Sequence, residues 1–97
     1  MPTYVTLSNF TDQGMKNIKD TTKRAEAFRK AAKETGITVK EIVWTQGQYD
    51  LVTIVEAPDD AAMSAMSLSV AKLGNVTGQT LRAFTAADMD KILAKVT

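Results

Sequence analysis

The chain has 97 residues, 44% of them hydrophobic and 24% charged, and its formal net charge is +1. This length fits one domain, residues 1–97, and leaves no room for two cores. The small charge excludes a strong attraction for nucleic acid or anionic lipid. No apolar run reaches the ~18 residues of a membrane helix, and no secretory signal is visible. We therefore expect a cytoplasmic protein without nucleic-acid or membrane partners.

Cysteine and histidine are both absent. Their absence excludes disulfides, thiol catalysis, Ser-His-Asp systems, His-ligated haem and the usual zinc sites. A general acid or base would have to be Asp, Glu, Lys or Tyr with a strongly shifted pKa. We predict no metal site, no cofactor and no assignable catalytic residue, and whether the protein is an enzyme stays open.

Residues 3–10 alternate in character and predict a first strand, with Tyr4 and Thr6 on one face and Val5 and Leu7 on the other.

Apolar or small side chains then recur at steps of three and four over residues 12–35, which predicts a helical region. One helix of that length would measure about 36 Å and overshoot strands of ~20 Å. Thr11 or Asp12 can cap the start of this region, and Asp20 starts a second capping signal. The prediction is a short helix, a bend near Asp20 and a longer helix to Glu34, after which Gly36 releases the chain.

Residues 38–46 predict the second strand, and Pro58 ends the third. Gly47-Gln48 suits a two-residue hairpin turn. That turn would pair Trp44 with Leu51, Ile42 with Thr53, and Lys40 with Val55.

Asp59 or Asp60 can cap the next helix, and Gly74 ends it. Met63 and Met66 of this helix look like core residues. Residues 76–84 predict a fourth strand. Thr85 to Asp88 then resembles a capping box with Asp in place of Glu, which would open a final amphipathic helix.

This order of elements predicts an α+β, ferredoxin-like split βαβ fold, β-α-β-β-α-β with an added C-terminal helix. Its four-stranded antiparallel sheet would carry the two main helices on one face. The basic first helical region is interrupted by acidic residues, which favours a solvated helix face over an RNA or lipid patch.

Both faces of the strands are partly apolar, so we expect the face without helices to pack on a second copy as a homodimer or higher homo-oligomer. A pocket between the paired sheets would suit a small molecule. The residues predicted on the uncovered face are Tyr4, Thr6, Ile42, Trp44, Leu51, Val55, Arg82 and Phe84.

Seven residues are candidates for binding a ligand: Tyr4, Thr6, Trp44, Tyr49, Asp50, Arg82 and Phe84. Arg82 is the best candidate for an anion, since a partly buried guanidinium needs an acidic partner. The alternatives are an ion pair with Glu41 or Glu56, or an arginine that lies along the interface. Asp50 could instead bond turn amides, and Trp44 could be an interface or core residue.

Several motifs resemble the GYD domain family over almost the whole chain: Thr11-Asp12-Gln13-Gly14, Gly47-Gln48-Tyr49-Asp50, Glu56-Ala57-Pro58-Asp59-Asp60, Leu73-Gly74-Asn75-Val76 and Thr80-Leu81-Arg82-Ala83-Phe84. Here Gln48 separates the glycine from Tyr49-Asp50. The resemblance implies a dimeric α/β barrel and carries no catalytic residues over.

Three functions remain open at this stage. The leading one is a homo-oligomeric module that binds a small, partly apolar molecule. The second is a cofactor-independent monooxygenase- or isomerase-like enzyme using Tyr49, Asp50 or Arg82. The third is a structural assembly subunit with a dry interface.

Overall fold

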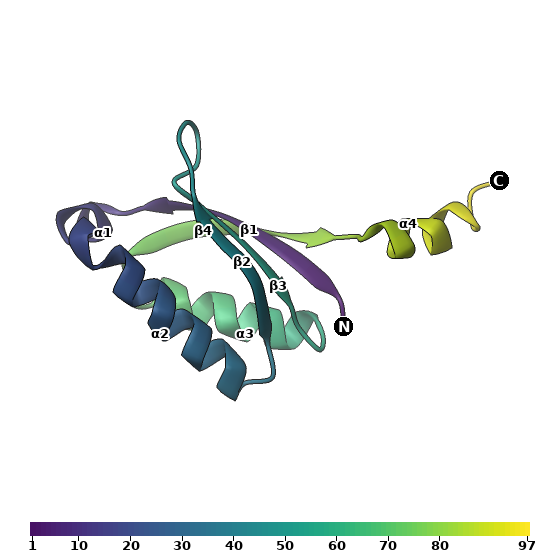
Figure 1. Cartoon of the computed structure of the whole chain (residues 1–97), viewed down its shortest axis with the longest axis horizontal. Helices are drawn as coiled ribbons and strands as arrows, with labels where there is room; N and C mark the ends of the chain where they lie inside the picture. Colours follow the sequence, from purple (N-terminus) through teal and green to yellow (C-terminus); the bar gives the residue numbers. More distant parts are fainter.

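The computed structural model describes residues 1–97 (Figure 1). Its elements in chain order are β1 (Thr3–Phe10), α1 (Asp12–Lys16), the 3-10 turn η1 (Ile18–Asp20), α2 (Thr21–Glu34), β2 (Thr38–Trp44), β3 (Leu51–Glu56), α3 (Asp60–Ala71), β4 (Val76–Ala83) and α4 (Ala86–Leu93).

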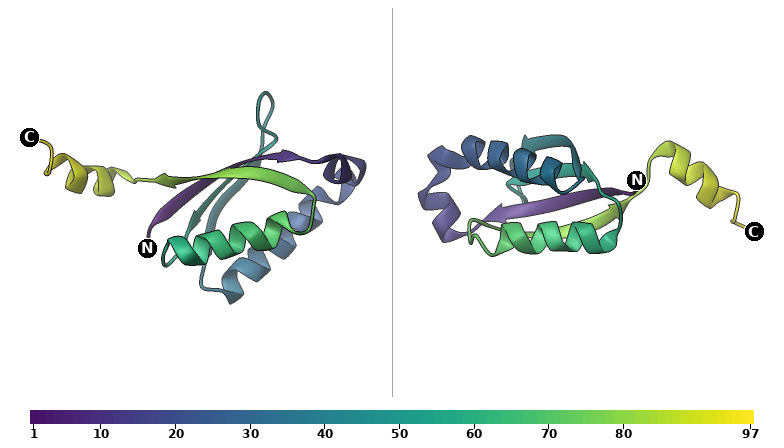
Figure 2. Two further views of the ribbon diagram at one scale, coloured as in Figure 1. Left: turned by 180° about the vertical axis from the view of Figure 1, so that it is seen from behind. Right: turned by 90° about the horizontal axis from the view of Figure 1, so that it is seen from below.

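The four strands form one antiparallel sheet in the order β2-β3-β1-β4. Helices α2 and α3 both lie on one face of it, and β1 passes between them in the view from below (Figure 2). This open sheet with its helices confirms the α+β, ferredoxin-like prediction. No helix is long and apolar enough to cross a membrane.

Three helix starts follow the capping signals of the sequence, whereas Asp20 precedes α2 without a side-chain capping bond. The Thr11 and Asp59 side chains accept hydrogen bonds from the amides of Gly14 and Ala62 and so cap α1 and α3. Thr85 and Asp88 form the reciprocal capping box at the start of α4. Each cap satisfies amides that have no partner inside the helix.

The predicted hairpin register is confirmed for two pairs, Trp44 with Leu51 and Ile42 with Thr53. It is wrong for Lys40, because a β-bulge between Val39 and Glu41 places Val39 opposite Val55. The bulge inserts one extra residue and so reverses the facing of the strand beyond it. As a result Val39, and not the lysine, packs against the core.

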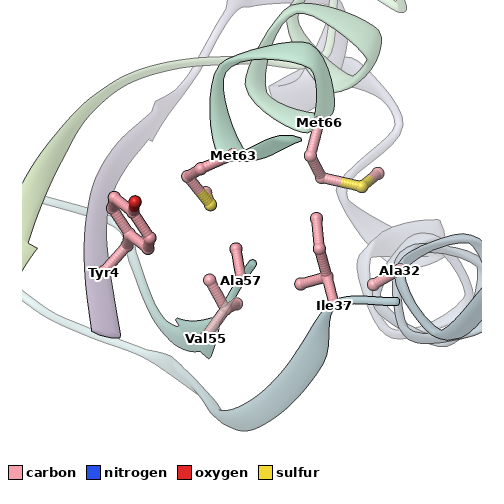
Figure 3. Close-up of a cluster of buried hydrophobic side chains, with 7 residues drawn as sticks. All are labelled: Tyr4, Ala32, Ile37, Val55, Ala57, Met63 and Met66. Carbon is pink, nitrogen blue, oxygen red and sulfur yellow. The ribbon is translucent and has the colours of Figure 1, made fainter. Parts of the chain in front are cut away.

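The core lies between the sheet and one end of the two helices (Figure 3). Tyr4 and Val55 from the sheet are 4% and 1% exposed, and they face Met63 and Met66 of α3. Both methionines are buried, as predicted. The remaining members of the cluster, from the end of α2 and both ends of the β2–β3 hairpin, are Ala32, Ile37 and Ala57.

The structure reverses the predicted faces of the sheet. Tyr4, Ile42 and Val55 are buried beneath the helices, and Thr6, Trp44 and Leu51 point to the same side. Arg82 also shares this side, because it pairs with Tyr4 across β1 and β4. The alternation grouped these residues correctly, but their assignment to the uncovered face was wrong.

The opposite surface, which we call the bare face, carries the other half of the alternation. Its apolar part consists of Val5, Leu7, Val43, Val52, Ile54 and Leu81. These residues form two rows across the sheet, because Val5 pairs with both Ile54 and Leu81, and Val52 pairs with both Leu7 and Val43. No helix of the chain covers the bare face (Figures 1 and 2).

Candidate functional site

A groove opens between α2 and α3 with the sheet as its floor, and we call it the interhelical groove. Its volume is about 540 Å³. Ile42, Leu51 and Trp44 contribute to the floor, Phe28 contributes to the α2 wall, and Met66 to the α3 wall. The lining is mainly apolar, and the volume lies within the ~300–1,000 Å³ typical of small-molecule sites.

The groove exists because the core fills only part of the space under the helices. The core cluster occupies the end of α2 near Ala32, where α2 turns into β2 through Ile37. Toward the start of α2 the facing residues are small, such as Thr21 and Ala25. Small side chains cannot bridge the distance from helix to sheet, so the space stays open.

Hydroxyl groups provide much of the polar part of this groove, which also includes Arg24 and Asn75. Thr6 Oγ1 lies 3.3 Å from Thr80 Oγ1, and Ser67 Oγ lies 3.3 Å from the same atom. The three hydroxyls therefore link β1, β4 and α3. Each can donate or accept a hydrogen bond, so a ligand with either kind of group could exchange into this set. Ser8 and Thr53 are buried deeper in the floor.

Trp44 stands at one end of the groove. Its indole Nε1 donates a 3.0 Å hydrogen bond to Thr21 Oγ1, the first residue of α2. The ring is 41% exposed. The bond fixes the ring between β2 and α2, where one side contacts the groove and the other contacts solvent.

A second cluster of side chains, formed by Tyr4, Asp60 and Arg82, lies near the start of β1. The Tyr4 hydroxyl donates a hydrogen bond to Asp60 Oδ1 in the first turn of α3. The bond to the Asp60 carboxylate, together with burial, raises the pKa of Tyr4 above its usual 10.0, and the nearby Arg82 opposes that rise. The neutral phenol is the form that can donate, so the bond keeps its proton in place.

Arg82 makes neither of the predicted ion pairs. Glu56 pairs with Lys40 at 3.1 Å, and Arg82 instead donates to the carbonyl oxygens of Thr3 and Ala83. Its guanidinium carbon also lies 5.5 Å from the centre of the Tyr4 ring and 4.9 Å from that of Phe84. These distances suit cation–π attraction, and they place Arg82 between the two rings.

Tyr49 and Asp50 lie in the loop between β2 and β3. The Asp50 carboxylate accepts a 3.0 Å hydrogen bond from the amide of Phe10, and its own amide donates to Ser8 at 2.9 Å. Asp50 thus ties the loop to the end of β1. The amide that its carboxylate binds belongs to Phe10 and is not one of the turn amides that the sequence suggested. Neither residue lines the interhelical groove.

The seven predicted site residues therefore fall into separate groups. Thr6 and Trp44 line the groove. Tyr4, Arg82 and Phe84 gather near the start of β1, while Tyr49 and Asp50 lie beyond its other end. The residues between Tyr4 and Phe10 span about 20 Å of strand. One small molecule cannot touch Tyr49, Asp50 and Arg82 together at that separation.

Sequence reasoning missed Phe28, Ser67 and Thr80 as groove residues. Phe28 belongs to the apolar pattern of residues 12–35, and nothing in that pattern distinguishes a groove wall from core. Thr80 shares its strand face with Arg82, which was a usable signal. Ser67 lies beside the buried Met66 on α3, and only the helix placement reveals its role.

Two of the motif stretches meet at the far end of the sheet. The amide of Thr11 donates to the Asn75 carbonyl at 3.0 Å, and Gln13 Nε2 donates to Asn75 Oδ1 at 2.9 Å and to Leu73 O at 3.0 Å. Gly14 packs against the same backbone, where a Cβ would lie 2.0 Å from the Asn75 carbonyl oxygen. This contact joins α1 to the turn before β4 at that end of the sheet.

Comparison with known proteins identifies the family of this chain. The family model described as "GYD domain" matches residues 4–93. A protein of Thermus thermophilus, named "Glutamine synthetase and cystathionine beta-lyase binding protein", is 33% identical over 90 residues, which cover 92% of this chain and 95% of that protein. No solved structure was found to match. The matched residues include all four helices and, apart from Thr3, all four strands, and the chain therefore belongs to the GYD domain family.

Proposed function

We propose that this protein is a homo-oligomeric binding module that recognises an enzyme, with glutamine synthetase and cystathionine beta-lyase as the first candidates. The observation that carries the proposal is the Thermus relative, whose name describes binding to those two enzymes and whose similarity covers 95% of its length. A match of that extent includes both surfaces described above, so a shared mode of binding needs no segment that this chain lacks.

In this proposal the bare face and the interhelical groove have different roles. The bare face pairs two copies, because its six apolar side chains form one continuous patch without a helix over it. The interhelical groove then faces outward on each copy. Its rim carries Leu68 and Leu73, which are 70% and 62% exposed. Exposed apolar side chains beside an apolar groove form a patch of the kind that marks contact with another protein.

The test is a binding measurement with the chain immobilised and each purified enzyme in solution. We expect one of the two enzymes to bind. Leu68→Lys should weaken that binding by about tenfold or more, because a lysine replaces an apolar contact. The matched control is Ala65→Lys on the same helix outside the groove, which should bind like the wild type. Equal binding by both variants, or none by the wild type, would contradict the proposal.

A second function is supported by the groove itself: binding of a small, partly apolar molecule. The volume of about 540 Å³ and the Thr6, Ser67 and Thr80 hydroxyls provide an apolar enclosure with a few polar groups. This pocket lies between helices and sheet, so it differs from the pocket between sheets that the sequence suggested. A thermal-shift screen of metabolites tests it, and stabilisation should disappear when the groove is filled by Ala25→Phe.

An enzymatic role through Tyr49, Asp50 and Arg82 has less support, because those residues lie at opposite ends of β1.

A further inference from the structure

The C-terminal helix α4 stands away from the rest of the molecule. It extends beyond the end of β4 and gives the chain its long axis of 51 Å (Figure 1). It makes no substantial contact with any other helix or strand. Four apolar side chains on and just after α4 are exposed: Met89, Ile92, Leu93 and Val96.

These four side chains share one side of the helix, because they recur at steps of three and four residues. Leu93 is 56% and Val96 67% exposed. The opposite side carries Asp90, Lys91 and Lys95. A helix of this length is marginal in water without tertiary packing, so its apolar side needs a partner to keep it folded.

The connection to β4 holds α4 away from its own sheet. Thr85 is extended, with φ −70° and ψ 171°, and its capping box with Asp88 fixes where the helix begins. Arg82 stacks on Phe84 just before this point and bonds the Ala83 carbonyl. To reach its own bare face, α4 would have to reverse direction at the segment that these contacts hold (Figure 2).

The size of the bare face indicates what covers α4. Four strands about 4.8 Å apart, overlapping for six residues of ~3.3 Å each, outline roughly 400 Å². A stable interface buries about 800 Å² on each partner. This flat footprint is smaller than the accessible surface that a stable pair buries, and α4 is a further exposed apolar surface, beyond the end of β4 (Figure 1).

We propose that α4 is an exchanged arm, whose apolar side packs against a second copy of the chain at the margin of the paired bare faces. Under a two-fold axis each copy gives one arm and receives one. The arms enlarge the interface and supply the cover that α4 lacks. This inference rests on the pairing proposed above, and it adds a defined role for residues 84–97.

The test uses photo-cross-linking on the full chain. A benzoylphenylalanine residue in place of Leu93 is activated in a mixture of ¹⁴N- and ¹⁵N-labelled copies, and the linked peptides are identified by mass. We expect links between differently labelled copies. A stable dimer without links between copies would overturn the arm but leave the pairing intact. A monomer at all concentrations would overturn both, so the two failures are distinguishable.

A pair of substitutions gives an independent measurement. Leu93→Glu places a charge on the apolar side of α4, and Lys91→Glu places the same residue on the polar side. Leu93 is exposed within one chain, so neither change should disturb the protomer fold, which circular dichroism checks. We expect Leu93→Glu to raise the dimer dissociation constant by roughly tenfold to a hundredfold and Lys91→Glu to leave it nearly unchanged. Equal effects would overturn the arm.

Discussion

The hydroxyl of Tyr4, on β1, donates a hydrogen bond to the carboxylate of Asp60, in the first turn of α3. This contact joins an inner strand of the sheet to the helix that forms one wall of the groove. The Tyr4 ring is at the same time part of the core. One side chain thus contributes both to the core and to the contact between α3 and the sheet.

Removing this hydroxyl should lower stability. Tyr4→Phe keeps the buried ring but loses the bond to Asp60. We expect the melting temperature to fall by about 5 °C, which is the effect of one lost hydrogen bond in a domain of this size. The matched control is Tyr49→Phe in the β2–β3 loop, outside the core cluster. Differential scanning calorimetry on both variants makes the comparison, and equal losses would show that the bond is not specific.

The same bond predicts how the phenol titrates. The pKa of Tyr4 is raised above 10.0, chiefly by its hydrogen bond to Asp60. The folded state therefore holds this proton more tightly than the unfolded state does. The resulting stability is complete below pH 10 and is lost as the pH rises from 10 through the folded pKa. The difference between the ultraviolet titrations of the wild type and Tyr4→Phe isolates this phenol. We expect that difference to lie above pH 10 and to move to lower pH in Asp60→Asn. A difference that Asp60→Asn leaves in place would contradict this assignment.

Gly14 provides a test of the contact between α1 and the turn before β4. A Cβ at this position would lie 2.0 Å from the Asn75 carbonyl oxygen. Because that oxygen belongs to the backbone, no flexible side chain can move away, and the structure itself must shift. We expect Gly14→Ala to lower the free energy of unfolding by about 2–3 kcal/mol, as overpacking does. Urea denaturation measures the change.

The matched control for this substitution is Gly36→Ala. Gly36 has φ +79° and open space around it, so alanine there costs backbone strain of about 1 kcal/mol without a clash. A Gly14→Ala loss no larger than that of Gly36→Ala would indicate that α1 can move away from Asn75.

The interhelical groove should admit an apolar dye. Trp44 is the only tryptophan and lines the groove. We expect anilinonaphthalene sulfonate to quench its emission by energy transfer on binding. Ala25→Phe should weaken the dye about tenfold by filling the space. Ala65→Phe on the outer side of α3 serves as the control and should bind like the wild type. Equal affinities would place the dye elsewhere.

The sequence was sufficient for most of the fold. The strand and helix order, the caps at Thr11, Asp59 and Thr85, and the pairing of Trp44 with Leu51 all depend on local patterns. Alternation also showed that Tyr4 and Thr6 share one face and Val5 and Leu7 the other. Which face the helices cover was not contained in that pattern, because both faces of the strands are apolar.

The candidate site was harder to predict because it depends on distances between elements. The bulge at Val39 shifts only a few residues, and no glycine or proline marks it. Arg82 was expected to need an acidic partner. Its guanidinium instead donates hydrogen bonds to two carbonyl oxygens and lies against two aromatic rings. Tyr49 and Asp50 are near Phe10 and far from Arg82 only because the β2–β3 loop docks at that end of β1.

The proposed function and the exchanged arm both require two copies of the chain to pair through the bare face. Sedimentation velocity over a wide range of concentrations measures this pairing, with the wild type beside Val52→Asp and the control Thr22→Asp on the exposed side of α2. We expect a dimer for the wild type and for Thr22→Asp, and a folded monomer for Val52→Asp. A wild type that remains a monomer throughout, or a Val52→Asp dimer as stable as the wild type, would contradict it.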